Sequence, residues 1–367
     1  MLSIYIHIPF CFKKCNYCSF ISFDSYKNEI DNYISAIEKE IKLSVNINKI
    51  INRQVSTIFF GGGTPSILSL QQLKKILKSI KKYFNVIENC ETTIEINPAT
   101  SIDFIGLKAI GFNRISIGVQ SFNDKELYFL ERLHNSNTAE KTIIEAKKYF
   151  DNVSIDLIYG IPKQTIKSFE NTINKAILLD IKHISAYSLM YEEGTKLTAI
   201  KNAMPTISID EETEMYEMLC AKLEKKCFNQ YEISNFATEN YECKHNKNYW
   251  NRKDYIGFGV AAHSCLSDVR FSNTIDLKNY FYKLEHNKLP VIEKEILTEE
   301  DIYEEKIFLG LRSSGLDKKL LNDDQLKFMQ ECIKSGFSKN TKNLFILTSK
   351  GKFITDSIVL NVLKKKM

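Results

Sequence analysis

The sequence predicts an α/β fold, because six apolar strand-like runs alternate with stretches of helical periodicity over the first two-thirds of the chain. Six such strand–helix units in series imply a parallel sheet with right-handed crossover connections. A closed barrel of this kind has eight strands. Six strands fit either a partial barrel or a doubly wound sheet, and the periodicity does not distinguish the two.

Length and composition agree with this fold class. The chain has 367 residues, which is more than the ~100–200 residues of a typical domain but fits a large α/β barrel with an appendage. Hydrophobic residues make up 44% and charged residues 26%, which argues against disordered and fibrous classes. No apolar run approaches the ~18–20 residues of a membrane span, which argues against an integral membrane protein.

The first strand is predicted over residues 3–8, where Ile4, Ile6 and Ile8 share one face, and the first helix over residues 30–45. The later strands are predicted from similar apolar runs at residues 55–60, 92–96, 114–119, 153–159 and 183–189. The later helices of this part are predicted from apolar residues at helical spacing, at residues 70–84, 101–110, 124–133, 139–150, 166–179 and 210–226.

The pattern changes after about Tyr231, where the sequence becomes dense in Tyr, His, Asn and Cys. From about Leu297 it turns helical again and ends with a short strand at residues 344–347 and a last helical stretch at 353–363. This arrangement predicts a small C-terminal α+β domain of winged-helix type. We therefore expect three parts, at residues 1–235, 236–296 and 297–367.

Charge and cysteine content indicate the setting of the protein. The net charge is +5, and the lysines are scattered along helical stretches, so no nucleic-acid partner is expected. The N-terminal residues lack the basic and apolar regions of a secretory signal, and the nine cysteines are unevenly spaced. These features predict a cytoplasmic protein in which some cysteines have a metal or redox role.

The strongest motif is Cys11-Phe-Lys-Lys-Cys15-Asn-Tyr-Cys18, directly after the first predicted strand. Three thiolates on one loop can hold three irons of a [4Fe–4S] cluster, because soft sulfur ligands suit iron. The fourth iron would then be open to a chelating small molecule. The alternatives are a zinc site that lacks its fourth ligand, or three unrelated buried cysteines.

A second motif, FFGGGTP at residues 59–65, ends the second predicted strand. Its glycines would let backbone amides approach a ligand closely, since no Cβ stands in the way. A plain strand-to-helix turn is the alternative interpretation. The ligand interpretation gains weight because loops after parallel strands open on the same face of the sheet, where ligands bind.

With these motifs in place, the chain resembles radical S-adenosylmethionine proteins and, more closely, the oxygen-independent coproporphyrinogen III oxidase family. The matching segments are YIHIPFC (5–11), GGGTPS (61–66), EINP (95–98), RISIGVQSF (114–122), DLIYGIP (156–162), GFGVAAH (257–263) and LTSKG (347–351). The resemblance implies a partial (β/α)6 TIM-like barrel of radical SAM type at residues 1–235 and a HemN-type domain at 297–367.

The resemblance also implies which residues bind the cofactors. Cluster ligands would be Cys11, Cys15 and Cys18. Contacts to S-adenosylmethionine are implied at Tyr5, Tyr17, Gly62, Gly63, Thr64, Glu95, Gln120, Arg132 and Asp156, with Met190 facing the adenine. An electron donor such as flavodoxin or ferredoxin would reduce the cluster.

Physical reasons support several of these contacts. Glu95 and Asp156 are read as the ends of the third and fifth strands, so their carboxylates would point into the mouth of the barrel, and Gln120 ends the fourth. Arg132 would meet a carboxylate in a bidentate pair. The alternatives are that the carboxylates cap the following helices and that Arg132 lies on a helix surface.

Two branches of the family differ in their motifs. The oxidase branch has an N-terminal extension and a fourth cysteine two residues after the third. Here Met1 is four residues before Tyr5, and Phe20 stands at the position of the fourth cysteine. The HemW-type branch of haem chaperones has an H-N-x-x-Y-W motif, which this sequence matches from His245 to Trp250.

The resemblance therefore implies a chaperone that binds haem and passes it to an acceptor apoprotein, and peripheral contact with a membrane acceptor is compatible with this role. The alternative is the oxidase, which converts coproporphyrinogen III to protoporphyrinogen IX by radical oxidative decarboxylation. A radical enzyme with an unrelated substrate is a third hypothesis. Whether the protein is an enzyme stays open at this point.

His245 could supply an axial ligand to haem iron, with Tyr249 and Trp250 as flat apolar surface for the macrocycle. Alternatively, these aromatic residues fill a domain junction while His245 bonds to the backbone. A further alternative is a four-ligand metal site formed by the pairs Cys243/His245 and His263/Cys265. The remaining cysteines are expected to be buried small hydrophobes, namely Cys90, Cys220, Cys227 and Cys332.

Overall fold

The computed structural model describes residues 1–24, 29–201 and 205–365. At its centre, six parallel strands pair in the order of the chain. These strands are β1 (Leu2–Ile8), β2 (Gln54–Gly62), β3 (Asn85–Ile96), β4 (Arg114–Gln120), β5 (Asn152–Tyr159) and β6 (His183–Ser188). A doubly wound sheet reverses its strand order, so the uninterrupted order identifies the partial barrel.

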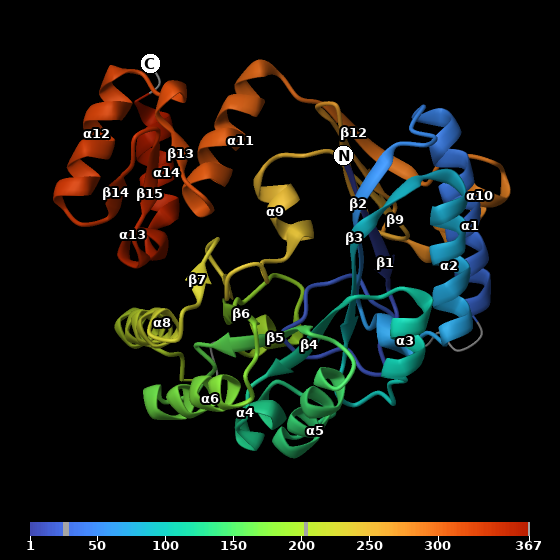
Figure 1. Cartoon of the computed structure of the whole chain (residues 1–367), viewed down its shortest axis with the longest axis horizontal. Helices are drawn as coiled ribbons and strands as arrows, with labels where there is room; N and C mark the ends of the chain where they lie inside the picture. Colours follow the sequence, from blue (N-terminus) through green and yellow to red (C-terminus); the bar gives the residue numbers. More distant parts are fainter. Residues whose placement is uncertain (25–28, 202–204, 366–367) are drawn as a thin grey trace.

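Helices follow the outer side of the curved sheet (Figure 1). The helices that alternate with the six strands are α1 (Ile30–Ile47), α2 (Leu70–Tyr83), α3 (Phe104–Ile110), α4 (Asp124–Phe129), α5 (Ser136–Lys147) and α6 (Ile166–Leu178). After β6 come α7 (Lys196–Ile200) and α8 (Ile209–Glu224). A short 3-10 helix, η1 (Pro65–Ile67), follows β2.

Both edges of the sheet are extended by strands that the sequence did not predict. Next to β1 lie β9 (Tyr255–Phe258), which runs parallel to it, then the antiparallel strands β10 (His263–Leu266), β11 (Val269–Asn273) and β12 (Val291–Ile296). Beyond β6 lie β8 (Asn235–Ala237) and β7 (Asn229–Gln230). Across the described residues this makes a 12-stranded sheet whose outer strands, β12 and β7, do not pair with each other, so the barrel is open.

Residues 236–296, expected to connect two domains, therefore supply most of one side of the sheet. They also contain α9 (Lys244–Trp250) and α10 (Leu277–Glu285). The strands were missed because β9 to β12 are only four to six residues long, so any alternation or apolar run in them is too short to stand out.

Capping residues explain where predicted helices differ from the structure. The helix predicted at 101–110 begins at Phe104, because the Asp103 side chain accepts from the Gly106 N–H. The helix predicted at 124–133 ends at Phe129, and Glu131 adopts a left-handed conformation with φ 55°. Residues 130–134 therefore form a turn, which carries Arg132 to the site described below.

The C-terminal residues form a unit with its own hydrophobic core, which includes Ile307, Leu311, Met329 and Phe345. Its helices are α11 (Glu299–Arg312), α12 (Asp323–Lys334), α13 (Ser349–Phe353), α14 (Thr355–Lys364) and the 3-10 helix η3 (Lys318–Leu320). Its antiparallel sheet has the order β13 (Leu316–Asp317), β15 (Leu344–Leu347) and β14 (Ser338–Asn340). This is an α+β unit that Figure 1 shows beside the barrel, above α8.

Glu305 on α11 fastens this unit to the extended sheet. Its carboxylate accepts hydrogen bonds from the Arg252 Nε at 2.6 Å and from an Nη of Arg270 on β11. Arg252 also donates to Asp268 at 2.8 Å. One carboxylate thus pairs with two guanidinium groups, one from the turn after α9 and one from β11.

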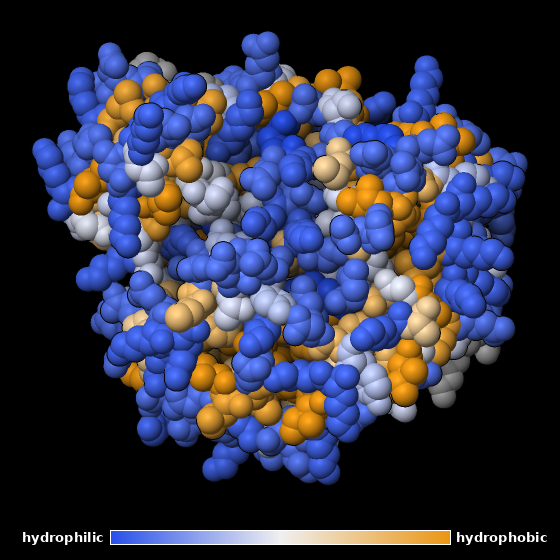
Figure 2. Space-filling view, in the orientation of Figure 1, coloured by the Kyte–Doolittle hydropathy of each residue, from blue (hydrophilic) through white to orange (hydrophobic). Residues whose placement is uncertain are grey.

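Polar side chains cover most of the face seen in Figure 2, and apolar side chains gather there only in smaller groups. Within the described residues, every helix is too short or too polar to traverse a lipid bilayer.

A buried carboxylate ties the sheet extension to α1. Glu40 accepts hydrogen bonds from the Tyr280 hydroxyl at 2.6 Å, the Gly259 N–H at 2.8 Å and the Asn273 Nδ2 at 2.6 Å. Burial raises the pKa of Glu40 to about 7, although these three donors act in the opposite direction. The protonated carboxyl group is therefore favoured in the folded state.

We expect Glu40→Gln to change how stability depends on pH. The folded-state pKa lies above the unfolded value, so the contribution of Glu40 is complete below about pH 4.5 and is lost as pH rises through about 7. Relative to Glu40→Gln, the wild type should lose up to about 3 kcal/mol of unfolding free energy across this range. Thermal unfolding between pH 5 and 8 measures it. Glu38→Gln on the same helix is the control, and a wild-type profile parallel to that of Glu40→Gln would contradict the expectation.

Candidate functional site

The three predicted cluster cysteines lie on the loop that follows β1. The loop is held by hydrogen bonds from the Cys11 N–H to the Phe23 carbonyl at 3.0 Å and from the Cys18 N–H to the Cys15 carbonyl at 3.3 Å. All nine cysteines of the chain are free thiols. Burial raises the pKa of the Cys11 and Cys18 thiols.

The glycine-rich turn after β2 packs directly against this loop. A Cβ on Gly63 would lie 2.7 Å from the Phe10 carbonyl oxygen and 3.0 Å from the Cys11 Sγ. Gly62 has a φ of 110°, and a Cβ there would lie 2.6 Å from the His7 ring. The glycines are therefore required for the turn to approach the cysteine loop so closely.

Side chains from the carboxyl ends of the strands enclose a cavity of about 400 Å³ beside the cysteine loop. Most of the residues predicted to contact S-adenosylmethionine line it, namely Tyr17, Gly62, Gly63, Thr64, Glu95, Gln120, Arg132, Asp156 and Met190. Cys18 lines it as well. The structure thus brings together residues that are spread over most of the barrel sequence.

Arg132 is not a surface helix residue. It is half-buried in the turn after α4, where its Nη2 donates to the Gly118 carbonyl at 2.7 Å and its Nη1 donates to the Cys15 Sγ at 3.5 Å. Its Nε is buried without a hydrogen-bond partner. This unused donor suits a ligand carboxylate that is absent from the protein itself.

Two other predicted residues differ in detail. Asp156 lies in the middle of β5 and not at its end, and it accepts a hydrogen bond from the Ser116 Oγ at 3.4 Å. Its carboxylate still reaches the cavity because it is on the concave face of the sheet. Met190 lies just after β6 and is 64% exposed, which places it at the rim.

Glu95 and Asp156 place two half-buried carboxyl groups in the same cavity. Burial raises the pKa of Glu95 to about 8, and the nearby charge of Asp156 adds to this effect. The Gly62 N–H, which donates to Glu95 at 3.2 Å, acts in the opposite direction. Burial likewise raises the pKa of Asp156. Such a pair suits a ligand with an ammonium group or hydroxyl donors.

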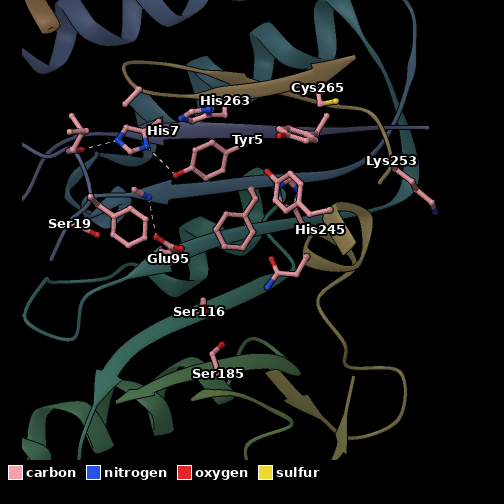
Figure 3. Close-up of a pocket in the computed structure, with 18 of the residues that line it drawn as sticks. Tyr5, His7, Ser19, Glu95, Ser116, Ser185, His245, Lys253, His263 and Cys265 are labelled. Atoms are coloured by element: carbon pink, nitrogen blue, oxygen red, sulfur yellow. Dashed lines mark hydrogen bonds between the residues drawn. The ribbon is translucent and has the colours of Figure 1, made fainter. Parts of the chain in front are cut away.

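A larger cavity of about 760 Å³ extends from this pocket into the barrel (Figure 3). The two cavities share the lining residues Ser19, Phe20, Gly62, Glu95, Asp156 and Tyr187. Aromatic rings form part of its wall, including Tyr5, which stacks on Phe59 with a centroid distance of 6.3 Å. Cationic side chains also line it, namely Arg114, Arg252, Lys253 and Arg270.

Tyr5 and His245, the remaining predicted binding residues, line this larger cavity and not the smaller one. The His245 imidazole is 1% exposed, with its Nδ1 hydrogen-bonded to the Thr57 hydroxyl at 2.8 Å and its Nε2 to the Tyr249 hydroxyl at 2.9 Å. Burial lowers its pKa to about 3. His245 could bind a metal only by giving up one of these hydrogen bonds.

The helix that carries His245 docks at the amino ends of the strands. Glu91, near the start of the parallel part of β3, accepts from the N–H groups of Lys244 and His245, both at 3.0 Å. Tyr249 packs edge-to-face against Tyr255 with a centroid distance of 4.6 Å. Trp250, expected to offer flat surface to a ligand, is not among the described residues that line the cavity.

The alternative four-ligand metal site does not form. Among the described residues no three His, Cys, Asp or Glu side chains converge on one metal-ion position, and this holds for the three loop cysteines as well as for these two pairs. Cys243 instead donates to Glu91 at 3.6 Å. Cys90, Cys220 and Cys332 are buried as expected, whereas Cys227 is exposed.

The predictions from sequence did not include Arg114, which is 2% exposed and lies at the floor of the larger cavity. Its Nε is buried without a partner, and no carboxylate of the described residues is within ion-pair distance of it. The period of two along β4, from Gly118 through Ser116 to Arg114, would have placed it on the concave face.

Comparisons with known proteins agree with this geometry. Residues 5–176 match the model of the radical SAM superfamily. The chain is 35% identical to a Bacillus subtilis protein named "Heme chaperone HemW", over 98% of both chains. It is 34% identical to a protein of the same name from Buchnera aphidicola subsp. Schizaphis graminum, over 98% of this chain and 97% of that protein.

Among solved structures, coproporphyrinogen III oxidase (HemN) from Escherichia coli matches with a TM-score of 0.85 and 25% identity, over 98% of this chain and 89% of that one. Membership of the superfamily implies a [4Fe–4S] cluster and S-adenosylmethionine. The chain belongs to the radical SAM superfamily, in the HemW-type branch of the HemN family.

Proposed function

We propose that this protein is a haem chaperone, which binds haem in the larger cavity and passes it to an acceptor apoprotein in the cytoplasm. The observation that carries the proposal is the similarity, over nearly the full length, to relatives named "Heme chaperone HemW". The cavity supports it, because a volume of about 760 Å³ with aromatic walls suits a flat macrocycle. Its arginines suit the two propionates.

Within this proposal, Cys11, Cys15 and Cys18 hold the [4Fe–4S] cluster, and S-adenosylmethionine occupies the smaller cavity. Three structural features support this fit: the three thiols on one loop, the partnerless Nε of Arg132, and the close packing of Gly63 against the Cys11 loop. When both are bound, a reduced cluster supplies the electron that generates a radical from the ligand. A small electron carrier such as flavodoxin or ferredoxin would deliver that electron.

The residues of the chain have separate roles toward that ligand. Arg132 can donate to its carboxylate, while Glu95 and Asp156 can accept from its amino and hydroxyl groups. Met190 and Tyr17 bound the pocket on its outer and inner sides. The buried position of Glu95 keeps a proton on its carboxyl group until a cation replaces it.

Cys15→Ala should abolish the cluster, because two thiolates do not hold it. After anaerobic reconstitution, the variant should lose the absorbance near ~400 nm and nearly all bound iron. Cys227→Ser is the matched control, since Cys227 is exposed and far from the loop in sequence, and it should keep both. Full iron content in Cys15→Ala would mean that other ligands hold the metal.

Glu95→Gln should weaken the pH dependence of S-adenosylmethionine binding. In the wild type, the ligand's cationic group must displace a proton from a carboxyl group with a pKa of about 8, so affinity should rise with pH. Any pH dependence that remains in Glu95→Gln comes from titration of the ligand itself. After division by this dependence, the affinity of the wild type should rise about fivefold between pH 7 and pH 8. Calorimetry in two buffers should also show fewer protons released by the variant. Equal slopes would exclude this contact.

The second candidate function is that of an oxygen-independent coproporphyrinogen III oxidase. The observation in its favour is the close structural match to HemN together with the intact smaller cavity. Against it, Phe20 replaces the fourth cysteine expected of that branch.

Both functions can be tested on one anaerobic preparation. A haem chaperone should bind one haem per chain in a titration with haemin, seen as a saturable Soret shift, and should form no protoporphyrinogen when coproporphyrinogen III, reductant and S-adenosylmethionine are supplied. Turnover of the porphyrinogen without haem binding would replace the chaperone with the oxidase. Transfer of the bound haem to an apoprotein added afterwards then measures the second half of the proposed role.

A further inference from the structure

Haem in the larger cavity requires a protein ligand for its iron, and a histidine imidazole is the commonest. The chain has six histidines, and the structure describes all of them. An imidazole binds iron through a nitrogen lone pair, so a histidine qualifies only if it reaches the cavity and has a nitrogen free to bind.

Three of the six have both ring nitrogens engaged. His7 bonds to the Tyr5 hydroxyl and the Ile21 carbonyl, His183 to the Ser154 and Tyr231 hydroxyls, and His245 to the Thr57 and Tyr249 hydroxyls. His134 is buried against the Val119 carbonyl, and His286 lies exposed on α10. Neither His134 nor His286 lines the larger cavity.

His263 is the remaining imidazole. It begins β10, is exposed and lines the larger cavity, and its ring has no hydrogen bond to any other described residue. Figure 3 shows it close to His7 and Tyr5, with Cys265 further along the same strand. Residues two apart share a face of a strand, so His263 and Cys265 both face the cavity.

The strands on both sides of β10 place an aromatic ring and a cation beside His263. Gly257 on β9 pairs with Tyr5 of β1, and a Cβ on Gly257 would lie 2.5 Å from the His263 carbonyl oxygen. The glycine therefore lets the start of β10 pack closely on β9, next to Tyr5 of β1. On β11, Arg270 pairs with Cys265 and so presents a cation on the same face.

We propose that His263, and not His245, supplies the axial imidazole to the iron of the bound haem. This rests on the proposed haem-binding function and assigns a residue to it. His263 would bind through a ring nitrogen that needs no other bond to be broken, Tyr5 would lie against the macrocycle, and Arg270 would pair with a propionate. His245 would stay buried in the barrel, hydrogen-bonded to the Thr57 and Tyr249 hydroxyls.

The test uses the full chain and ferric haem. His263→Ala should weaken haem binding by at least about tenfold and lose the Soret position and electron paramagnetic resonance signal of imidazole-ligated iron. Added free imidazole should restore that signal. His263→Met should bind haem and show the spectrum of a thioether ligand, which would demonstrate that residue 263 binds the iron. Because this variant must be folded to bind haem, it also controls for a folding defect in His263→Ala. His286→Ala, which removes an exposed imidazole outside the cavity, should match the wild type.

The outcomes separate this inference from the proposed function. A wild-type protein that fails to bind haem would overturn both. Haem binding with unchanged spectra and affinity in His263→Ala and His263→Met would overturn only the assignment of His263. A thiolate signal in the wild type that is lost in Cys265→Ser, with the His263 variants unaffected, would assign the iron ligand to Cys265 and would also overturn the assignment.

Discussion

The site depends on the parallel pairing of six strands in chain order. Pairing of β1 to β6 in register brings the cysteine loop, the glycine turn, Glu95 and Gln120 to the same edge of the sheet. Alternation along each strand then selects which side chains face the interior, and on β4 this face carries Arg114, Ser116 and Gly118. A one-residue slip in any of these pairings would turn such side chains into the helical layer.

Sequence patterns were sufficient for the six central strands and the cysteine triplet, and the family resemblance added most residues of the smaller cavity. The central strands were predictable because their apolar runs are long, and the loops that follow parallel strands open on one face of the sheet. The patterns could not give the position of α9, because the hydrogen bond between Thr57 and His245 joins residues 188 apart in sequence. The residue types of the His245 motif were visible, but whether its imidazole was free to bind a ligand depended on contacts that no local pattern encodes.

The two cavities differ in chemistry although they share a wall. The smaller has two half-buried carboxyl groups and a half-buried guanidinium, which suits a compact zwitterionic ligand. The larger has rings and cationic side chains, which suits a broad anionic one. Because Glu95 and Asp156 line both cavities, a change of charge in the smaller cavity also changes the electrostatic potential in the larger one.

Glu305 gives the larger cavity an unusual boundary. The carboxylate that attaches α11 to the sheet also lines the cavity, together with its partners Arg252 and Arg270. An incoming carboxylate therefore meets guanidinium groups that already have an internal anion. It must share them with Glu305 or replace Glu305. Ligand binding in the larger cavity and attachment of the C-terminal unit therefore compete for the same two guanidinium groups.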